Sequence, residues 1–239
     1  MIKLFICGIS GRLGSSIVDE VKKATNISLI GGLVSGREDS SNKKLSSQGF
    51  QIISDLNDLT DADVVIDCST SLDLIKIKEK CELIGASLIV ASTGKGDFRE
   101  IFNNKSLSIP VLAAPNLSIG IAFLSNLLNY VSEKKLSLKR INIEETHHNK
   151  KIDTPSGTAL MLKKELIELF NVDEIEIISN RDESSVGTHK INIYLGDEIL
   201  SLEHKALDRK AFALGALNLI EWIHRKSPGI YSVQDALNN

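Results

Sequence analysis

The sequence predicts an α/β protein with a doubly wound parallel sheet, followed by a smaller α+β region with a mixed sheet. Two observations lead to this prediction. Short apolar runs alternate with helix-period stretches through the first half of the chain, as in βαβ units. From about residue 117, polar and apolar residues alternate instead, which is typical of strands that have one covered face.

The first half opens with an apolar strand over 2–7, a helix over 15–24 and a second apolar run over 27–34. These three segments have the length of one βαβ unit, about 30 residues. Further buried strands are predicted at 64–66, 88–90 and 111–113, and helices at 72–84 and 97–103.

The second half contains helical patterns over 118–135 and 155–170, and alternating stretches over 140–145 and 190–195. Gly196-Asp197 is predicted to be the turn of a hairpin that returns over 198–205. The last apolar helix, over 211–225, is expected to return to the first domain. We therefore expect a dinucleotide-binding domain over 1–117, completed by 209–239, and a substrate-binding and oligomerisation domain over 118–208.

The composition excludes several classes of protein. The 239 residues are 42% apolar and 25% charged, which allows one large core or two modest ones. The 28 basic and 31 acidic residues give a net charge of -3, without a long basic run, and this argues against nucleic acid as a partner. No stretch approaches the ~20 apolar residues that span a bilayer, and the chain opens on a strand pattern, so a cytoplasmic protein is expected.

The three cysteines are Cys7, Cys68 and Cys81. Their number is odd, they lack CxxC spacing, and they lie in or beside apolar runs. They are expected to be reduced core residues.

A glycine-rich loop, Gly-x-x-Gly-x-x-Gly, follows the first strand and contains Gly8, Gly11 and Gly14. Glycines at a strand-to-helix turn let backbone N–H groups and a helix N-terminus approach a pyrophosphate. The pattern differs by one position from the usual dinucleotide fingerprint, so a tight structural turn remains the alternative. Its place between strand and helix favours a Rossmann-like nucleotide site.

The end of the second strand indicates which dinucleotide is preferred. NAD is usually held there by an acidic residue that binds the two ribose hydroxyls. No carboxylate precedes Glu38 in this segment, whereas Ser35 and Arg37 offer a hydroxyl and a guanidinium. Arg37 is therefore predicted to contact a 2′-phosphate, with an ordinary exposed arginine as the alternative.

Residues 145–160 read ETHHNKKIDTPSGTAL. Adjacent histidines on a strand point to opposite faces, and no HExxH motif or second His/Cys cluster is visible, so no metal site is expected. Ser156 lacks the Gly-x-Ser-x-Gly setting of a hydrolase nucleophile.

The remaining interpretation of residues 145–160 is an anion-binding site at the start of a helix. The predicted donors are Ser156, Gly157 and Thr158, because N–H groups and a hydroxyl at a helix N-terminus can hold a carboxylate. Lys151 and His148 add positive charge, and His147 is a candidate proton donor. A plain helix N-cap beside solvated lysines is the alternative.

This run closely resembles the signature E-x-H-H-x-x-K-x-D-x-P-S-G-T-A of the 4-hydroxy-tetrahydrodipicolinate reductase family, nicotinamide-dependent enzymes of the diaminopimelate route to lysine. The resemblance covers nearly the whole chain. It includes the glycine loop over 8–14, the segments Asp67-Cys68-Ser69, Ala91-Ser92-Thr93-Gly94 and Ala114-Pro115-Asn116-Leu117-Ser118-Ile119-Gly120, and residues 209–216.

The resemblance implies a role for individual residues. His147 and Lys151 resemble the family's catalytic residues. The substrate carboxylates are assigned to His148, Ser156, Gly157, Thr158 and Arg209. The cofactor is assigned to Gly8, Gly11, Arg12, Leu13, Gly14, Ser35, Arg37, Ala91, Thr93, Ala114 and Asn116.

The implied activity is reduction of 4-hydroxy-tetrahydrodipicolinate to tetrahydrodipicolinate with NADPH or NADH. The expected partner is a small dicarboxylate, and the family resemblance implies a homo-oligomer, either a tetramer or a dimer. The segment over 187–209 is shorter than in many relatives, which bears on that oligomer. The alternatives are a nucleotide-binding redox regulator without turnover and a reductase of another small amino dicarboxylate.

Overall fold

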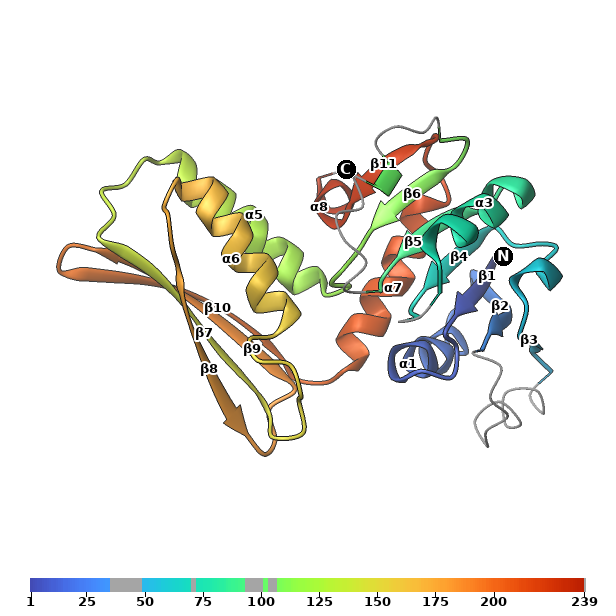
Figure 1. The fold of residues 1–239 in the computed structure, drawn as a ribbon, viewed down its shortest axis with the longest axis horizontal. Coiled ribbons are helices and arrows are strands. Elements are labelled where there is room, and N and C mark those ends of the chain that lie inside the picture. The colour runs from blue at the N-terminus through green and yellow to red at the C-terminus, as the bar shows by residue number, and fades with distance from the viewer. Residues whose placement is uncertain (35–48, 70–71, 93–100, 103–106, 239) are drawn as a thin grey trace. The chain divides into compact units, whose positions relative to one another are not determined.

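A computed structural model of the protein describes residues 1–34, 49–69, 72–92, 101–102 and 107–238. The chain divides into two compact units. The first comprises Met1–Leu117 and Phe212–Asn239, and the second comprises Ser118–Ala211. Within the described ranges, none of the helices has both the length and the apolar character that crossing a membrane requires. Figure 1 traces the elements along the chain.

The described part of the first unit is built on a seven-stranded sheet in the order β11-β6-β5-β4-β1-β2-β3 (Figure 1). Every neighbouring pair of strands is parallel. The strands are β1 (Ile2–Cys7), β2 (Ile27–Leu33), β3 (Gln51–Ile53), β4 (Val64–Asp67), β5 (Ser87–Val90), β6 (Pro110–Ala113) and β11 (Gly229–Ser232). Because the strand order reverses at β1, the predicted doubly wound parallel sheet is confirmed.

The helical elements of this unit are α1 (Arg12–Val21), η1 (Leu56–Asp58), α3 (Leu74–Ile84), α7 (Lys210–Ile223) and α8 (Val233–Leu237). The helix α3 is well delimited, because the Asp73 side chain accepts a hydrogen bond from the Ile75 N–H and Gly85 ends the helix at φ 73°. The predicted helix over 97–103 lies mostly outside the described residues.

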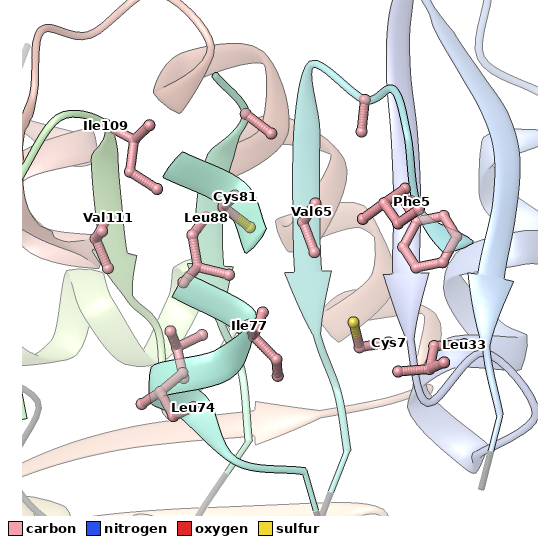
Figure 2. Packing of buried hydrophobic residues seen from close by; sticks show 14 of the residues in the cluster. Phe5, Cys7, Leu33, Val65, Leu74, Ile77, Cys81, Leu88, Ile109 and Val111 are labelled. Carbon is pink, nitrogen blue, oxygen red and sulfur yellow. The ribbon is translucent and has the colours of Figure 1, made fainter. Parts of the chain in front are cut away.

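The core of this unit lies between α3 and one face of the sheet, as Figure 2 shows. Alternate residues of neighbouring strands point to this face, among them Phe5, Val65 and Leu88. The helix contributes Ile77 and Cys81. The strands are apolar on both faces because a parallel sheet is covered on both. None of the three cysteines forms a disulfide in the part of the chain that the structure describes; Cys7 and Cys81 are buried and Cys68 is half-buried.

The second unit contains a four-stranded sheet in the order β10-β9-β7-β8. Its strands are β7 (Arg140–His148), β8 (Glu176–Asp182), β9 (Gly187–Leu195) and β10 (Glu198–Ala206). β7 and β8 are parallel, whereas the pairs β7/β9 and β9/β10 are antiparallel. The predicted mixed sheet is therefore confirmed, and Gly196 makes the tight turn between β9 and β10 at φ 72°.

The helices α5 (Ile119–Glu133) and α6 (Gly157–Phe170) lie side by side on one face of this sheet (Figure 1). Leu128 and Leu162 from the helices pack with Ile143 and Ile191 from the strands, and all four are fully buried. The two helices cover one face only, and this explains the alternation of polar and apolar residues in β7 and β9.

Candidate active site

The glycine loop connects β1 to α1 at the carboxyl edge of the first sheet. Gly8 has φ 81°, and the Gly11 N–H donates to its carbonyl oxygen over 3.0 Å. A Cβ atom on Gly14 would lie 2.4 Å from the same oxygen, so a side chain there is excluded. The predicted positions Arg12 and Leu13 form the first turn of α1, which the sequence placed at residue 15. That prediction was wrong by one turn.

The N-terminus of α1 is open to an anion. Its N-cap residue is Gly11, which has no side chain to hydrogen-bond the first N–H groups. Helix N-termini with such groups attract phosphates. The predicted nucleotide loop therefore ends at a helix start that has no side-chain cap.

Asp67, at the end of β4, organises the neighbouring strand ends. Its side chain is fully buried and accepts hydrogen bonds from the Ser69 N–H at 2.9 Å, the Ser69 Oγ at 2.5 Å and the Ser92 Oγ at 2.8 Å. Sequence reasoning gave this carboxylate no role. It ties the segment after β4 to the segment after β5, beside the glycine loop.

The remaining residues predicted to bind the cofactor have different outcomes. Ala91 and Ala114 follow the ends of β5 and β6, where their N–H groups continue the backbone ladder at 2.9 Å each. Asn116 follows on the same segment and is half-buried. The structure therefore places these three at the same edge of the sheet as the glycine loop. Ser35, Arg37 and Thr93 lie outside the described residues.

In the second unit, the mixed sheet brings Glu145, His147 and His189 together. Glu145 and His147 are two positions apart on β7, so they share a face, and Glu145 is paired in register with His189 on β9. The three residues are 1%, 7% and 4% exposed. His189 was missed by sequence reasoning, because only the strand pairing brings it beside the motif.

Glu145 is a buried carboxylate with an ordered environment. Its Oε1 accepts hydrogen bonds from the Ser156 N–H at 3.0 Å and the Ser179 Oγ at 2.8 Å, and Arg181 Nη1 lies 4.0 Å away. Burial by itself raises the pKa of Glu145, but the hydrogen bonds from Ser156 and Ser179 outweigh it and the net pKa is lowered. The carboxylate is therefore ionised at neutral pH.

The His147 ring lies against this carboxylate. Its Nδ1 is 3.4 Å from Glu145 Oε2, and its ring meets that of His189 edge-on with centroids 5.1 Å apart. Burial lowers the pKa of His147, and the charge of Glu145 opposes that effect. Burial, followed by the neighbouring His147, lowers the pKa of His189 to about 4. The net pKa of His147 is lowered, so the Glu145 charge offsets only part of the effect of burial, to which the charges of Lys151 and Arg181 add.

The start of α6 combines the predicted anion donors with a carboxylate of the chain itself. Lys151 Nζ lies 2.8 Å from both Oδ1 and Oδ2 of Asp153. Burial raises the pKa of Asp153, but the hydrogen bond from Lys151 and the charge of that ammonium contribute to outweighing it, and the net pKa is lowered. One donor that was predicted for the substrate site, Lys151, therefore holds Asp153 in this structure.

Ser156 is the N-cap of α6. Its Oγ accepts a hydrogen bond from the Ala159 N–H at 3.1 Å and lies 3.3 Å from His189 Nε2. The alternative that this serine serves as a helix cap is therefore confirmed for its hydroxyl. Thr158 follows in the first turn of the same helix.

His148 and Arg209 meet at the end of β7. Arg209 Nη2 lies 3.1 Å from His148 Nε2, although 61 positions separate the two residues. The fold therefore brings together two residues that were predicted to bind carboxylate.

Comparison with known proteins agrees with the fold and the motif. The model of the dihydrodipicolinate reductase N-terminus matches residues 2–117, and that of the dihydrodipicolinate reductase C-terminus matches residues 120–237. The chain belongs to the dihydrodipicolinate reductase family. The predictions of a reductase in the diaminopimelate route to lysine and of a nicotinamide cofactor are confirmed by this match.

Individual members of the reductase family align over the whole chain. A 4-hydroxy-tetrahydrodipicolinate reductase from Clostridium botulinum is 31% identical over 256 aligned positions, which cover 99% of this chain and 98% of the relative. One from Buchnera aphidicola is also 31% identical, covering 98% and 96%. Both alignments are longer than the 239 residues here, so this chain lacks residues that those relatives have.

Solved structures agree on the architecture. The dipicolinate-bound dihydrodipicolinate reductase from Paenisporosarcina sp. TG-14 has a TM-score of 0.78 at 21% identity, covering 98% of this chain and 99% of that one. An amine dehydrogenase from Mycobacterium smegmatis reaches 0.67 at 10% identity, covering 98% and 95%. These two similarities show that this chain shares its fold with that reductase and with that amine dehydrogenase.

Proposed function

We propose that this chain reduces 4-hydroxy-tetrahydrodipicolinate to tetrahydrodipicolinate with NADPH or NADH. The observation that carries the residue assignments is the ionised Glu145 carboxylate beneath His147, next to a helix start rich in donors. The reaction adds a hydride to one carbon of a conjugated imine-type ring and a proton to its neighbour, after loss of water. When bound, the reduced nicotinamide supplies the hydride.

His147 is assigned as the proton donor. The Glu145 carboxylate, 3.4 Å from Nδ1, stabilises the imidazolium and leaves Nε2 as the nitrogen that gives up a proton. A Cβ atom on Gly187 would lie 3.0 Å from Nε2, so a glycine at this position leaves room for the ring. Glu145 is therefore a positioning residue for His147.

The substrate carboxylates are assigned to His148, Ser156, Gly157, Thr158 and Arg209, and Lys151 is assigned as the second catalytic residue, which adds its charge beside them. The Lys151 ammonium already holds a carboxylate, that of Asp153, and this supports its ability to hold one from a ligand. Ser156 also fixes the helix start, because its Oγ accepts a hydrogen bond from the Ala159 N–H. These donors orient the ring and stabilise the negative charge that develops on it.

The cofactor is assigned to the carboxyl edge of the first sheet. Gly8, Gly11 and Gly14 allow the backbone to approach the pyrophosphate, and the first turn of α1 presents its N–H groups. Asp67 is assigned a positioning role, because it ties together the segments that carry Ala91 and Ser69. We assign the dinucleotide to the domain predicted over 1–117 and 209–239, and the substrate to residues 118–208 together with Arg209.

The decisive experiment is a coupled assay with the purified protein. The substrate is made in place by the preceding synthase, and oxidation of NADPH or NADH is followed at 340 nm, a standard nicotinamide readout. Turnover that depends on the synthase product supports the proposal. Binding of the cofactor without any turnover would identify a nucleotide-binding regulator instead.

The assembly and the compartment are also part of the proposal. We assign a homo-oligomer, a tetramer or a dimer, and a cytoplasmic location, from the family resemblance described above. Light scattering on the purified protein tests the first assignment, and a monomer at micromolar concentration would refute it.

A further inference from the structure

Glu145, His147 and His189 form a cluster, but the proton-donor role involves only Glu145 and His147 and gives no role to His189. Glu145 Oε2 lies 3.4 Å from His147 Nδ1 and 3.8 Å from His189 Nε2. One ligand atom from each of the three side chains lies within 4.8 Å of the others. Among the residues that the structure describes, this is the only such group of three close enough to share an ion.

Two of the converging atoms are not satisfied. Within the described part of the chain, Glu145 Oε2 and His147 Nδ1 are buried without a hydrogen-bond partner. Buried polar atoms nearly always have one. The other oxygen of Glu145 is held by Ser156 and Ser179, so Oε2 is fixed in its direction toward the two rings.

The donor set fits zinc. Two imidazole nitrogens and one carboxylate oxygen form the three-ligand set of many zinc sites, and tetrahedral bonds of about 2.0–2.1 Å place the ligand atoms about 3.3 Å apart. The distances of 3.4 and 3.8 Å are close to that spacing. Magnesium prefers six oxygen ligands and does not fit.

We propose that Glu145, His147 and His189 bind a zinc ion that inhibits the enzyme. The inhibition rests on the proposed function, because zinc on Nδ1 of His147 takes the place of the contact between the proton donor and Glu145. Arg181 lies 4.0 Å from the other oxygen of Glu145, and its positive charge weakens cation binding. Zinc binding is therefore expected to be reversible and weaker than at a structural zinc centre.

The binding test uses the metal alone. Zinc chloride is titrated calorimetrically into protein that has been stripped with EDTA and dialysed, with magnesium chloride as the comparison. One zinc ion per chain is expected for the wild type, with binding at least about 10-fold weaker in His189→Asn and in Glu145→Gln. His224→Asn is the matched control, because His224 is exposed and belongs to the other unit, and it should bind as the wild type does.

Each outcome decides the proposal. Equal zinc affinity in the wild type and both cluster variants, or no zinc binding, overturns it. Loss of binding in His224→Asn alone overturns it as well, because the site then lies elsewhere. Circular dichroism spectra of His189→Asn and Glu145→Gln are compared with that of the wild type, and only a variant with the wild-type spectrum is used to judge the proposal.

The inhibition is tested separately in the coupled assay. Zinc should reduce turnover in the wild type, EDTA should restore it, and His189→Asn should be at least about 10-fold less sensitive to zinc. Zinc binding without reductase activity refutes the proposed function and leaves the metal site standing. Reductase activity without zinc binding refutes the metal site and leaves the proposed function standing.

Discussion

Replacing Glu145 by Gln tests the pairing of carboxylate and imidazole directly. The change keeps the shape and the acceptor for Ser156 and Ser179, but it removes the charge 3.4 Å from His147 Nδ1. At that distance, an effective dielectric constant of about 20 gives a ceiling of about 5 kcal/mol for the ion pair. We expect about half of this in the transition state, which corresponds to a loss of about 30- to 100-fold in kcat/KM.

The same variant should change the pH dependence in a defined direction. A proton donor must be protonated, so kcat/KM falls as the pH rises through the pKa of His147. Burial lowers that pKa and Glu145 opposes the effect, so loss of the charge lowers the pKa further. The falling limb should therefore move to lower pH.

The control is Ser179→Ala, which removes one hydrogen bond to Glu145 but keeps the charge. Because the charge of Glu145 remains, the loss in kcat/KM should be smaller than in Glu145→Gln, and the limb should move less. The measurement is kcat/KM from about pH 4.5 to about pH 9 in buffers of constant ionic strength, a range that extends well below the ordinary imidazole pKa because that of His147 is lowered. An unchanged rate and an unchanged limb in Glu145→Gln would refute the pairing.

Three further predictions concern the donors, the space around the ring and the cofactor. Lys151→Ala and Thr158→Ala should each cost about 2 kcal/mol or more in transition-state binding, and unchanged kcat/KM in both would rule out the carboxylate assignment. Gly187→Ala should lower kcat about 10-fold with a change of only a few degrees in Tm, because its Cβ would lie 3.0 Å from His147 Nε2. Arg37→Ala should weaken NADPH selectively, and parallel titrations with NADH would contradict this if a strong NADH preference survived the substitution.

Five strands of the first sheet, β1, β2, β4, β5 and β6, were visible in the sequence because each contains a short apolar run. The start of α1 was not, since Gly14 falls in its first turn and a glycine there resembles a loop. Gly14 is needed because its missing side chain lets Gly8 approach. β3 and β11 were also missed, and both lie at the edges of the sheet.

In the second unit, periodicity predicted β9 and β10 and the two helices, but β8 was overlooked. It lies at the edge of the sheet, and none of its residues is buried. This omission affects the site, because β8 supplies Ser179 and Arg181 to Glu145. An edge strand of polar residues carries little signal in the sequence.

The part of the candidate site that lies within one short sequence run was predicted, and the part that comes from a distant strand was missed. The run over 145–160 identified His147, Lys151 and the helix start. His189 is 42 positions beyond His147, and only the antiparallel register of β7 and β9 places it opposite Glu145. The metal interpretation was set aside because adjacent histidines on a strand point to opposite faces. The zinc ligands proposed above instead combine His147 with Glu145, two positions earlier on β7, and with His189 on the neighbouring strand β9.

Asp153 has a consequence for how the site responds to its surroundings. Its carboxylate pairs with the Lys151 ammonium, so the charge of that donor is already neutralised in the absence of a ligand. A ligand that takes this place exchanges one carboxylate for another, and the local charge changes little. Affinity should then depend on ionic strength less steeply than the number of donors implies. Chloride and phosphate, which cannot reproduce the fit of a tethered carboxylate, should compete poorly for the empty enzyme.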